Sequence, residues 1–135
     1  MTNTQLQQKY AALLDQQGIK YSNHQGFYVR IPLKNTKSSF THVCDIHDGK
    51  ILLADYCGDC CTGIRAANRL AKAIQKQFPE FDIVVEKYSI FEIVVYKWIQ
   101  FDSIDALHQE VLSMATVVDE GARLGKEMLG EDFER

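Results

Sequence analysis

The stretch that decides the fold is Ile51-Leu52-Leu53-Ala54-Asp55-Tyr56-Cys57-Gly58-Asp59-Cys60-Cys61, together with the segment 64–78 that follows it. The first six residues are apolar enough for a strand, and the segment 64–78 repeats apolar residues at helical spacing. We therefore predict a strand, a tight turn that holds Cys57-x-x-Cys60, and a helix that ends before Pro79. Thiols in such a turn would face unpaired amides and the positive end of the helix dipole, which favour a thiolate.

Before this stretch, the sequence predicts one helix and three strands. Apolar residues recur at helical spacing over 6–14, and Gly18 is well placed to end that helix. The three strands are expected over 27–33, 40–46 and 50–55. Asp48-Gly49 is a strong signal for a tight hairpin between the second and the third.

After this stretch, two more strands are expected over 82–86 and 90–99, and a long helix over 103–128. The strand 90–99 is apolar on both faces, so it is either central and covered on both sides or lines a subunit interface. Gly121 and Gly125 in the last helix mark a fray, a kink or a close contact. We expect a single α+β domain over 1–129, with a largely antiparallel twisted sheet packed by helices, and a flexible tail over 130–135.

The predicted order of elements, α-β-β-β-α-β-β-α, resembles the type III secretion chaperone-like fold, which YbjN-like proteins share. The resemblance lies in element order, size and acidity. It implies a non-enzymatic homodimer that binds a protein partner. The stretch from Tyr56 to Cys60 also resembles the selenoprotein W-like branch of the thioredoxin superfamily, which implies that Cys57 is an attacking thiolate and Cys60 its resolving partner.

Composition and charge narrow the class of function. The chain has 135 residues, a net charge of −3 and 46% hydrophobic residues, typical of a globular domain. The acidic balance argues against nucleic-acid binding. We find neither a membrane-spanning run nor a signal peptide, so a cytoplasmic location with reduced cysteines is expected. We expect no cofactor.

The cysteines allow three interpretations. In the first, they are small, partly buried residues of a tight turn, in which Gly58 provides an unusual backbone angle. Alternatively, Cys57 and Cys60 form the redox pair of a thiol-disulfide oxidoreductase. A third possibility is structural zinc, because His42 and Cys44 alternate by two on one face of a neighbouring strand and could complete a set with Cys57 and Cys60.

Two groups of residues are candidates for binding a protein partner. Val94, Tyr96 and Trp98 share one face of the doubly apolar strand, and they belong either to an interface or to the core under the last helix. A basic stripe recurs at helical spacing on the second helix and is either a solvated face or a docking strip for an acidic partner. The stripe consists of Arg65, Arg69, Lys72 and Lys76.

Overall fold

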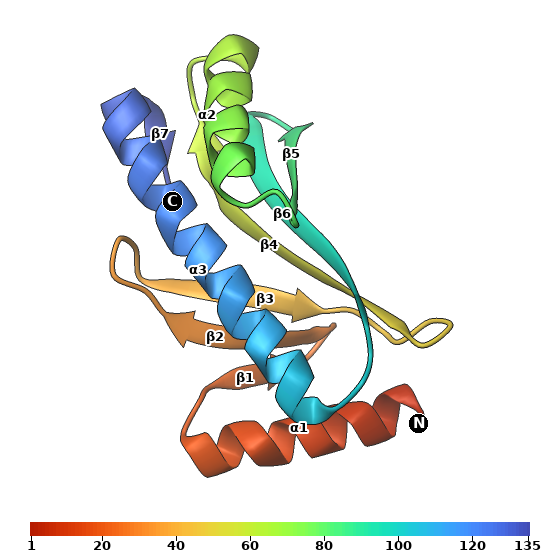
Figure 1. The fold of residues 1–135 in the computed structure, drawn as a ribbon. Coiled ribbons are helices and arrows are strands. Elements are labelled where there is room, and N and C mark those ends of the chain that lie inside the picture. Colours follow the sequence, from red (N-terminus) through yellow and green to blue (C-terminus); the bar gives the residue numbers. More distant parts are fainter.

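A computed structural model describes all residues 1–135 as three α-helices and a seven-stranded antiparallel sheet (Figure 1). The elements in chain order are α1 (Asn3–Gln17), β1 (Tyr21–Asn23), β2 (Phe27–Pro32), β3 (Ser38–Val43), β4 (Lys50–Cys60), α2 (Ile64–Gln77), β5 (Asp82–Lys87), β6 (Phe91–Gln100), α3 (Ile104–Leu129), the 3₁₀ turn η1 (Gly130–Asp132) and β7 (Phe133–Glu134). The predicted α+β class and the predicted order of the main elements are confirmed.

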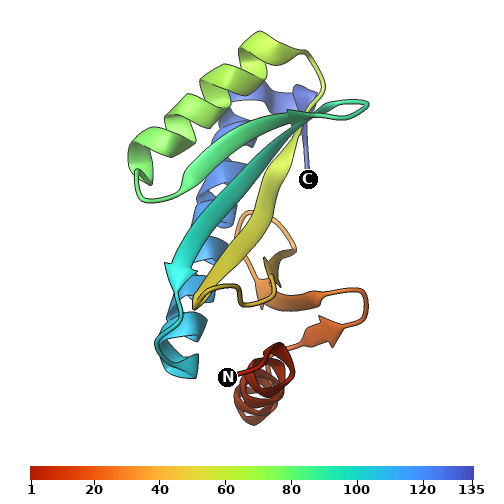
Figure 2. The same ribbon diagram turned by 90° about the vertical axis from the view of Figure 1, so that its right-hand side faces the viewer.

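The strand order in the sheet is β1-β2-β3-β4-β6-β5, and β7 pairs with β4. Every pairing is antiparallel. Helices α2 and α3 pack against one face of this sheet, with α3 running diagonally across it, and α1 lies at the β1–β2 end, where it contacts α3 (Figures 1 and 2). Successive side chains of β6 point to opposite faces of the sheet. Those on one face enter the core, and those on the other face point to the side away from α2 and α3.

The long helix α3 organises the core. Its 26 residues span about 39 Å at the usual rise per residue. The buried side chains of Leu107, Val111 and Met114 face the sheet. Near its end the helix approaches β4 closely, because a Cβ on Gly121 would lie 2.9 Å from Cβ of Cys57 and closer still to its sulfur. The close contact is therefore the correct one of the three interpretations of these glycines.

Local signals set several boundaries as expected. Gly18 ends α1 in the left-handed conformation, at φ 69°. Asp48 and Gly49 have φ values of 52° and 73°, as a tight hairpin turn requires. The cap of α3 differs from expectation by one residue: Asp102, with Asp105 three positions on, fits an acidic capping box, but the N-cap is Ser103, whose hydroxyl accepts a hydrogen bond from the Ala106 amide at 3.1 Å.

The predicted turn at Cys57-x-x-Cys60 is wrong. Strand β4 continues to Cys60, with a shift of register between Tyr56 and Gly58 that marks a β-bulge. Helix α2 starts only at Ile64, after Gly63 at its N-cap. The thiols therefore belong to a strand paired with β6 and do not lie at the N-terminus of a helix.

Residues 130–135, expected to be a flexible tail, are ordered against the sheet as η1 and β7. Phe133 is 5% exposed, and its ring occupies a slot between Gly58 of β4 and Gly125 of α3. A side chain at either glycine would collide with this ring. The absence of a side chain at these two positions thus makes room for an aromatic ring from the end of the chain.

Strand β7 fills a split in the sheet. Strands β3 and β4 pair in register only at His42 and Val43 and then diverge, which leaves polar backbone groups of β3 without a ladder partner. The Asp55 carboxylate accepts hydrogen bonds from the Phe40 amide and the Thr41 hydroxyl, each at 3.1 Å. Arg135 donates to the Ser38 carbonyl at 2.7 Å, so side chains take the place of the missing strand contacts.

Candidate functional site

The face of the sheet turned away from the helices, called here the open face, is the main candidate site. It carries large side chains that the chain's own core does not cover. The most exposed are Phe40 (49%), Val84 (39%) and Trp98 (56%), with Tyr88 (63%) in the turn between β5 and β6. Exposed aromatic area of this kind is typical of interaction sites.

Of the residues predicted to bind a partner, Val94, Tyr96 and Trp98 all lie on the open face. Val94 is 8% exposed and Tyr96 half-buried, and both line a cavity there. None of the three lies beneath α3, because the opposite side of β6 faces the helices. The structure thus places this group on a surface and not in the core under the last helix.

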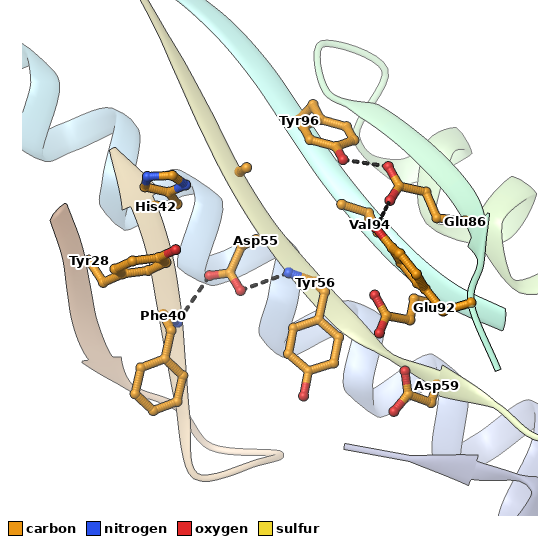
Figure 3. Close-up of a pocket in the computed structure, with 12 residues that line it drawn as sticks. Tyr28, Phe40, His42, Asp55, Tyr56, Asp59, Glu86, Glu92, Val94 and Tyr96 are labelled. Atoms are coloured by element: carbon orange, nitrogen blue, oxygen red, sulfur yellow. Dashed lines mark hydrogen bonds between the residues drawn. The ribbon is translucent and has the colours of Figure 1, made fainter. Parts of the chain in front are cut away.

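A cavity of about 310 Å³ opens on this face between the β2–β3 and β4–β6–β5 portions of the sheet (Figure 3). Its walls are largely aromatic and its acidic groups gather toward one end. It is lined by Tyr28, Phe40, His42, Ala54, Asp55, Tyr56, Asp59, Glu86, Tyr88, Glu92, Val94 and Tyr96. No basic residue is among them, apart from the imidazole of His42.

Three carboxylates form a row across adjacent strands of this cavity, called here the carboxylate row. Asp59 of β4 lies opposite Glu92 of β6, and Glu92 lies opposite Glu86 of β5. Like charges in directly opposed positions repel each other. Burial, followed by the repulsion of Asp59 and Glu86, raises the pKa of Glu92 above its ordinary value. Burial, followed by the charge of Glu134, raises the pKa of Asp59.

The three carboxylates of the row differ in their hydrogen bonds. The hydroxyls of Tyr88 and Tyr96 both donate hydrogen bonds to Glu86, the former at 3.0 Å. Asp59 has one carboxylate oxygen that is buried and has no hydrogen-bond partner. None of the three carboxylates forms an ion pair within the chain. Glu86 is thus held in place by two phenols, while Asp59 and Glu92 keep free capacity to accept hydrogen bonds.

Sequence reasoning missed the carboxylate row, because the three residues are dispersed along the chain. The register of β4, β6 and β5 brings them together. A usable signal exists in the alternation of β6, since Glu92 shares a face with Val94 and Tyr96. It is the only charged residue on the outward face of that strand.

The other end of the open face, called here the apolar end, is mostly apolar. A second hollow of about 360 Å³ lies there, on the β4–β6–β5 portion of the sheet, and it is lined by Leu52, Ile83, Val84, Tyr96 and Trp98 together with Gln75 and Asp82. Tyr96 lines both hollows, so it marks the boundary between the apolar end and the acidic cavity.

The predicted basic stripe is exposed on the outer surface of α2, so it does not contribute to the core. Helix α2 packs on β5, β6 and α3 from the side opposite the open face (Figure 2). The stripe and the group on β6 therefore form two separate surfaces. The four residues of the stripe are Arg65, Arg69, Lys72 and Lys76.

The positions of the thiols contradict the premise of the redox interpretation. Cys57 is fully buried, with its sulfur 3.9 Å from the Val117 carbonyl oxygen, and burial raises its thiol pKa far above the ordinary value. Burial, followed by the nearby Cys61 and Asp59, raises the pKa of Cys60 to about 11. A nucleophilic thiol needs the opposite shift. Cys57 instead fills the space left by Gly121.

The four residues of the zinc interpretation are not brought together. His42 and Cys44 do share a face, with Nδ1 and Sγ 3.6 Å apart, and they lie on the open face of β3 and just after it. Cys57 and Cys60 are buried on the helix side of β4. No group of three or more His, Cys, Asp or Glu side chains is arranged to hold a metal ion.

Comparison with known proteins supports the fold but gives no sequence family. No protein-family model matches the chain, and no curated protein matches its sequence. YbjN of Escherichia coli, described as a candidate transcription regulator, has a similar structure with a TM-score of 0.59, 12% identity, and coverage of 86% of this chain and 90% of YbjN.

Two further structures are similar. The Yersinia pestis type III secretion chaperone SycH, solved in complex with a fragment of YscM2, gives a TM-score of 0.53 at 11% identity, covering 91% of this chain and 99% of SycH. An uncharacterized protein from Methanothermobacter thermautotrophicus gives a TM-score of 0.54 at 12% identity, covering 94% of this chain and 99% of that protein. The chain thus has the YbjN and secretion-chaperone-like fold that its order of elements predicts. No helix in it is both long and apolar enough to cross a membrane.

Proposed function

We propose that this chain is a non-enzymatic, cytoplasmic protein-binding module that holds a protein partner on the open face of its sheet. The observation that carries the proposal is the aromatic surface around Tyr88, Tyr96 and Trp98, which no helix of the chain covers. Tyr and Trp contribute large contact area at low entropic cost, and for this reason they anchor many interfaces. The fold shared with SycH, which was solved with a bound protein fragment, agrees with this role.

The partner occupies the acidic cavity. Affinity purification from the native host should recover a protein with the wild-type chain and lose it with the double variant Phe40→Ala, Tyr88→Ala. Both side chains are largely exposed, so the variant should fold normally. Retention of every co-purifying protein by the double variant would contradict a binding role for the open face.

Two copies of the chain associate through the apolar end. A homodimer places the same patch of each copy in contact, and such a contact favours apolar groups over the acidic cavity, where like charges would meet. Light scattering coupled to size exclusion at micromolar concentration should give a dimer for the wild type and a monomer for Trp98→Thr. Ile64→Thr, at an exposed apolar residue of α2, is the matched control. A monomeric wild type would contradict the proposed homodimer but not the proposed partner site.

The basic stripe on α2 provides a second, electrostatic contact for acidic segments of the partner. Exposed charges of this kind act mainly on the association rate. Once a partner is identified, Arg69→Glu combined with Lys72→Glu should slow the association of the chain with that partner and weaken the dependence of the rate on salt. An unchanged rate would show that the stripe is only a solvated helix face.

A further inference from the structure

The acidic cavity has features that point to one class of ligand. It combines tyrosine rings with three carboxylates in register, and only Glu86 has internal hydrogen-bond donors. Two cations lie beside rings of the cavity, Arg30 over Phe40 and Arg135 over Tyr56, and Arg135 is bound to the backbone of β3 and β4 and pairs with Asp55. Neither forms an ion pair with a member of the row. The row therefore stays without a compensating charge.

We infer that this cavity binds the guanidinium group of an arginine in an extended segment of the partner, between the carboxylate row and the surrounding tyrosines. The inference rests on the proposed function, since it specifies the partner that the open face accepts. It commits to arginine because the planar guanidinium can bond two carboxylates in a forked geometry and stack on an aromatic ring. Lysine presents a single point charge and gains less from the ring faces.

Each part of the site has a distinct role. Glu92 and Asp59 accept hydrogen bonds from the guanidinium, which supplies donors that these two carboxylates lack within the chain. Tyr88 and Tyr96 hold Glu86 in position and present ring area to the stem of the arginine. Neighbouring apolar residues of the segment lie over Val94 and Phe40. The arrangement has no group of ligands that converges as a metal site requires.

A library of random linear peptides, displayed on phage and selected on the full chain at neutral pH and low salt, tests the inference. We expect the retained peptides to be enriched in arginine beside apolar residues. Replacing that arginine by citrulline, which keeps its shape without the charge, should weaken binding about tenfold or more, because charge-assisted hydrogen bonds are lost.

Variants of the chain complete the test. Glu92→Gln with Asp59→Asn should weaken the same peptides to a similar degree, whereas the control Glu80→Gln, an exposed acid outside the cavity, should leave them unchanged. The amide variants relieve repulsion, so they should fold at least as well as the wild type.

The outcomes separate the inference from the function on which it rests. Retained peptides without arginine enrichment, whose binding depends on Tyr88, would overturn the arginine site and leave the protein-binding function intact. Binding of calcium ions in place of arginine peptides would also overturn it. If no peptide is retained, the arginine site is wrong, whereas the open-face function is decided by the affinity purification with the Phe40→Ala, Tyr88→Ala variant.

Discussion

At the scale of single residues, three glycines determine where larger side chains can pack, because a glycine has no side chain. Gly121 makes room for Cys57, and Gly58 with Gly125 makes room for Phe133. These three contacts join β4, α3 and β7 at one end of the molecule. They also explain why a cysteine in a Cys-x-x-Cys spacing can be chemically inert, since Cys57 acts as a small apolar residue.

The contact of Gly121 with Cys57 can be tested by a double-mutant cycle. Gly121→Ala should lower the free energy of unfolding by about 1–3 kcal/mol, because the new methyl group overlaps the Cys57 side chain. Adding Cys57→Ala to this variant should recover part of the loss, a coupling that urea denaturation measures. Strictly additive effects would show that the two residues do not share this space.

Arg135 and Asp55 form a second contact that can be tested at this scale. Their side chains are 5% and 1% exposed, and their charged atoms are 3.9 Å apart. Burial keeps the pKa of Asp55 above its ordinary value, despite the hydrogen bonds of Tyr56, Thr41 and Phe40 and the charge of Arg135. Arg135→Met should cost about 3 kcal/mol at neutral pH, since it leaves a buried carboxylate without its cation.

The pH dependence of this loss follows from Asp55. Once the carboxyl is protonated, the missing cation no longer matters electrostatically, so the difference between variant and wild type should shrink at low pH. Urea denaturation at pH 7 and near pH 4 measures the change. A loss that is equal at both values would mean that Arg135 contributes only packing and backbone hydrogen bonds.

At the scale of elements, patterns within a short window of sequence were sufficient to predict the three helices and most of the strands. Gly18 and Asp48-Gly49 gave correct boundaries because caps and tight turns depend on neighbouring residues. The extension of β4 to Cys60 could not be predicted in the same way. Gly58 looks like the residue of a turn, but its bulge is stabilised by Phe133, which is 75 positions away in the chain. β7 depends on the same distant contact.

The candidate site was predicted only in part, for a related reason. Tyr96 and Trp98 could be found from the alternation of a single strand. The carboxylate row requires the register of three strands, and no local pattern encodes that register.

The docking of α1 on α3 predicts a dependence on pH. The Tyr10 hydroxyl lies 2.9 Å from Nδ1 of the buried His108, and the Tyr10 ring stacks on Phe27. Burial lowers the pKa of His108, although Asp105 opposes this shift. The folded chain therefore binds fewer protons here than the unfolded chain, and this contribution to stability is lost as the pH falls below about 6.5.

Amide hydrogen exchange checks this prediction. Protection of α1 should decrease between pH 7.5 and pH 5.5, after correction for the intrinsic exchange rate, and His108→Gln should remove most of the decrease. If α1 in the variant responds to pH as in the wild type, another group is responsible.

At the scale of the whole molecule, the carboxylate row should make the protein less stable than its fold allows. The pKa values of Asp59 and Glu92 are raised in the folded chain. At pH values just above the ordinary pKa of a carboxyl group, the folded chain therefore binds more protons than the unfolded chain. Their contribution to stability is therefore present at low pH and lost as the pH rises through the raised values.

Glu92→Gln should raise the free energy of unfolding at pH 7 by about 0.5 kcal/mol, the usual scale for a cross-strand pair. It should also flatten the dependence of stability on pH between 4 and 7. Thermal unfolding of the wild type, Glu92→Gln and the control Glu80→Gln measures both effects. A destabilised Glu92→Gln would show that the row supports the fold and is not a strained binding site.

The position of Trp98 has a practical consequence. It is the only tryptophan of the chain and is 56% exposed on the open face, so the indole is already in contact with water in the folded, unbound state. In a single copy of the chain its fluorescence should therefore change little in wavelength on unfolding, and it should shift to the blue when a second copy or another molecule covers that surface. The chain thus carries an intrinsic optical reporter of occupancy, which can follow association without any label.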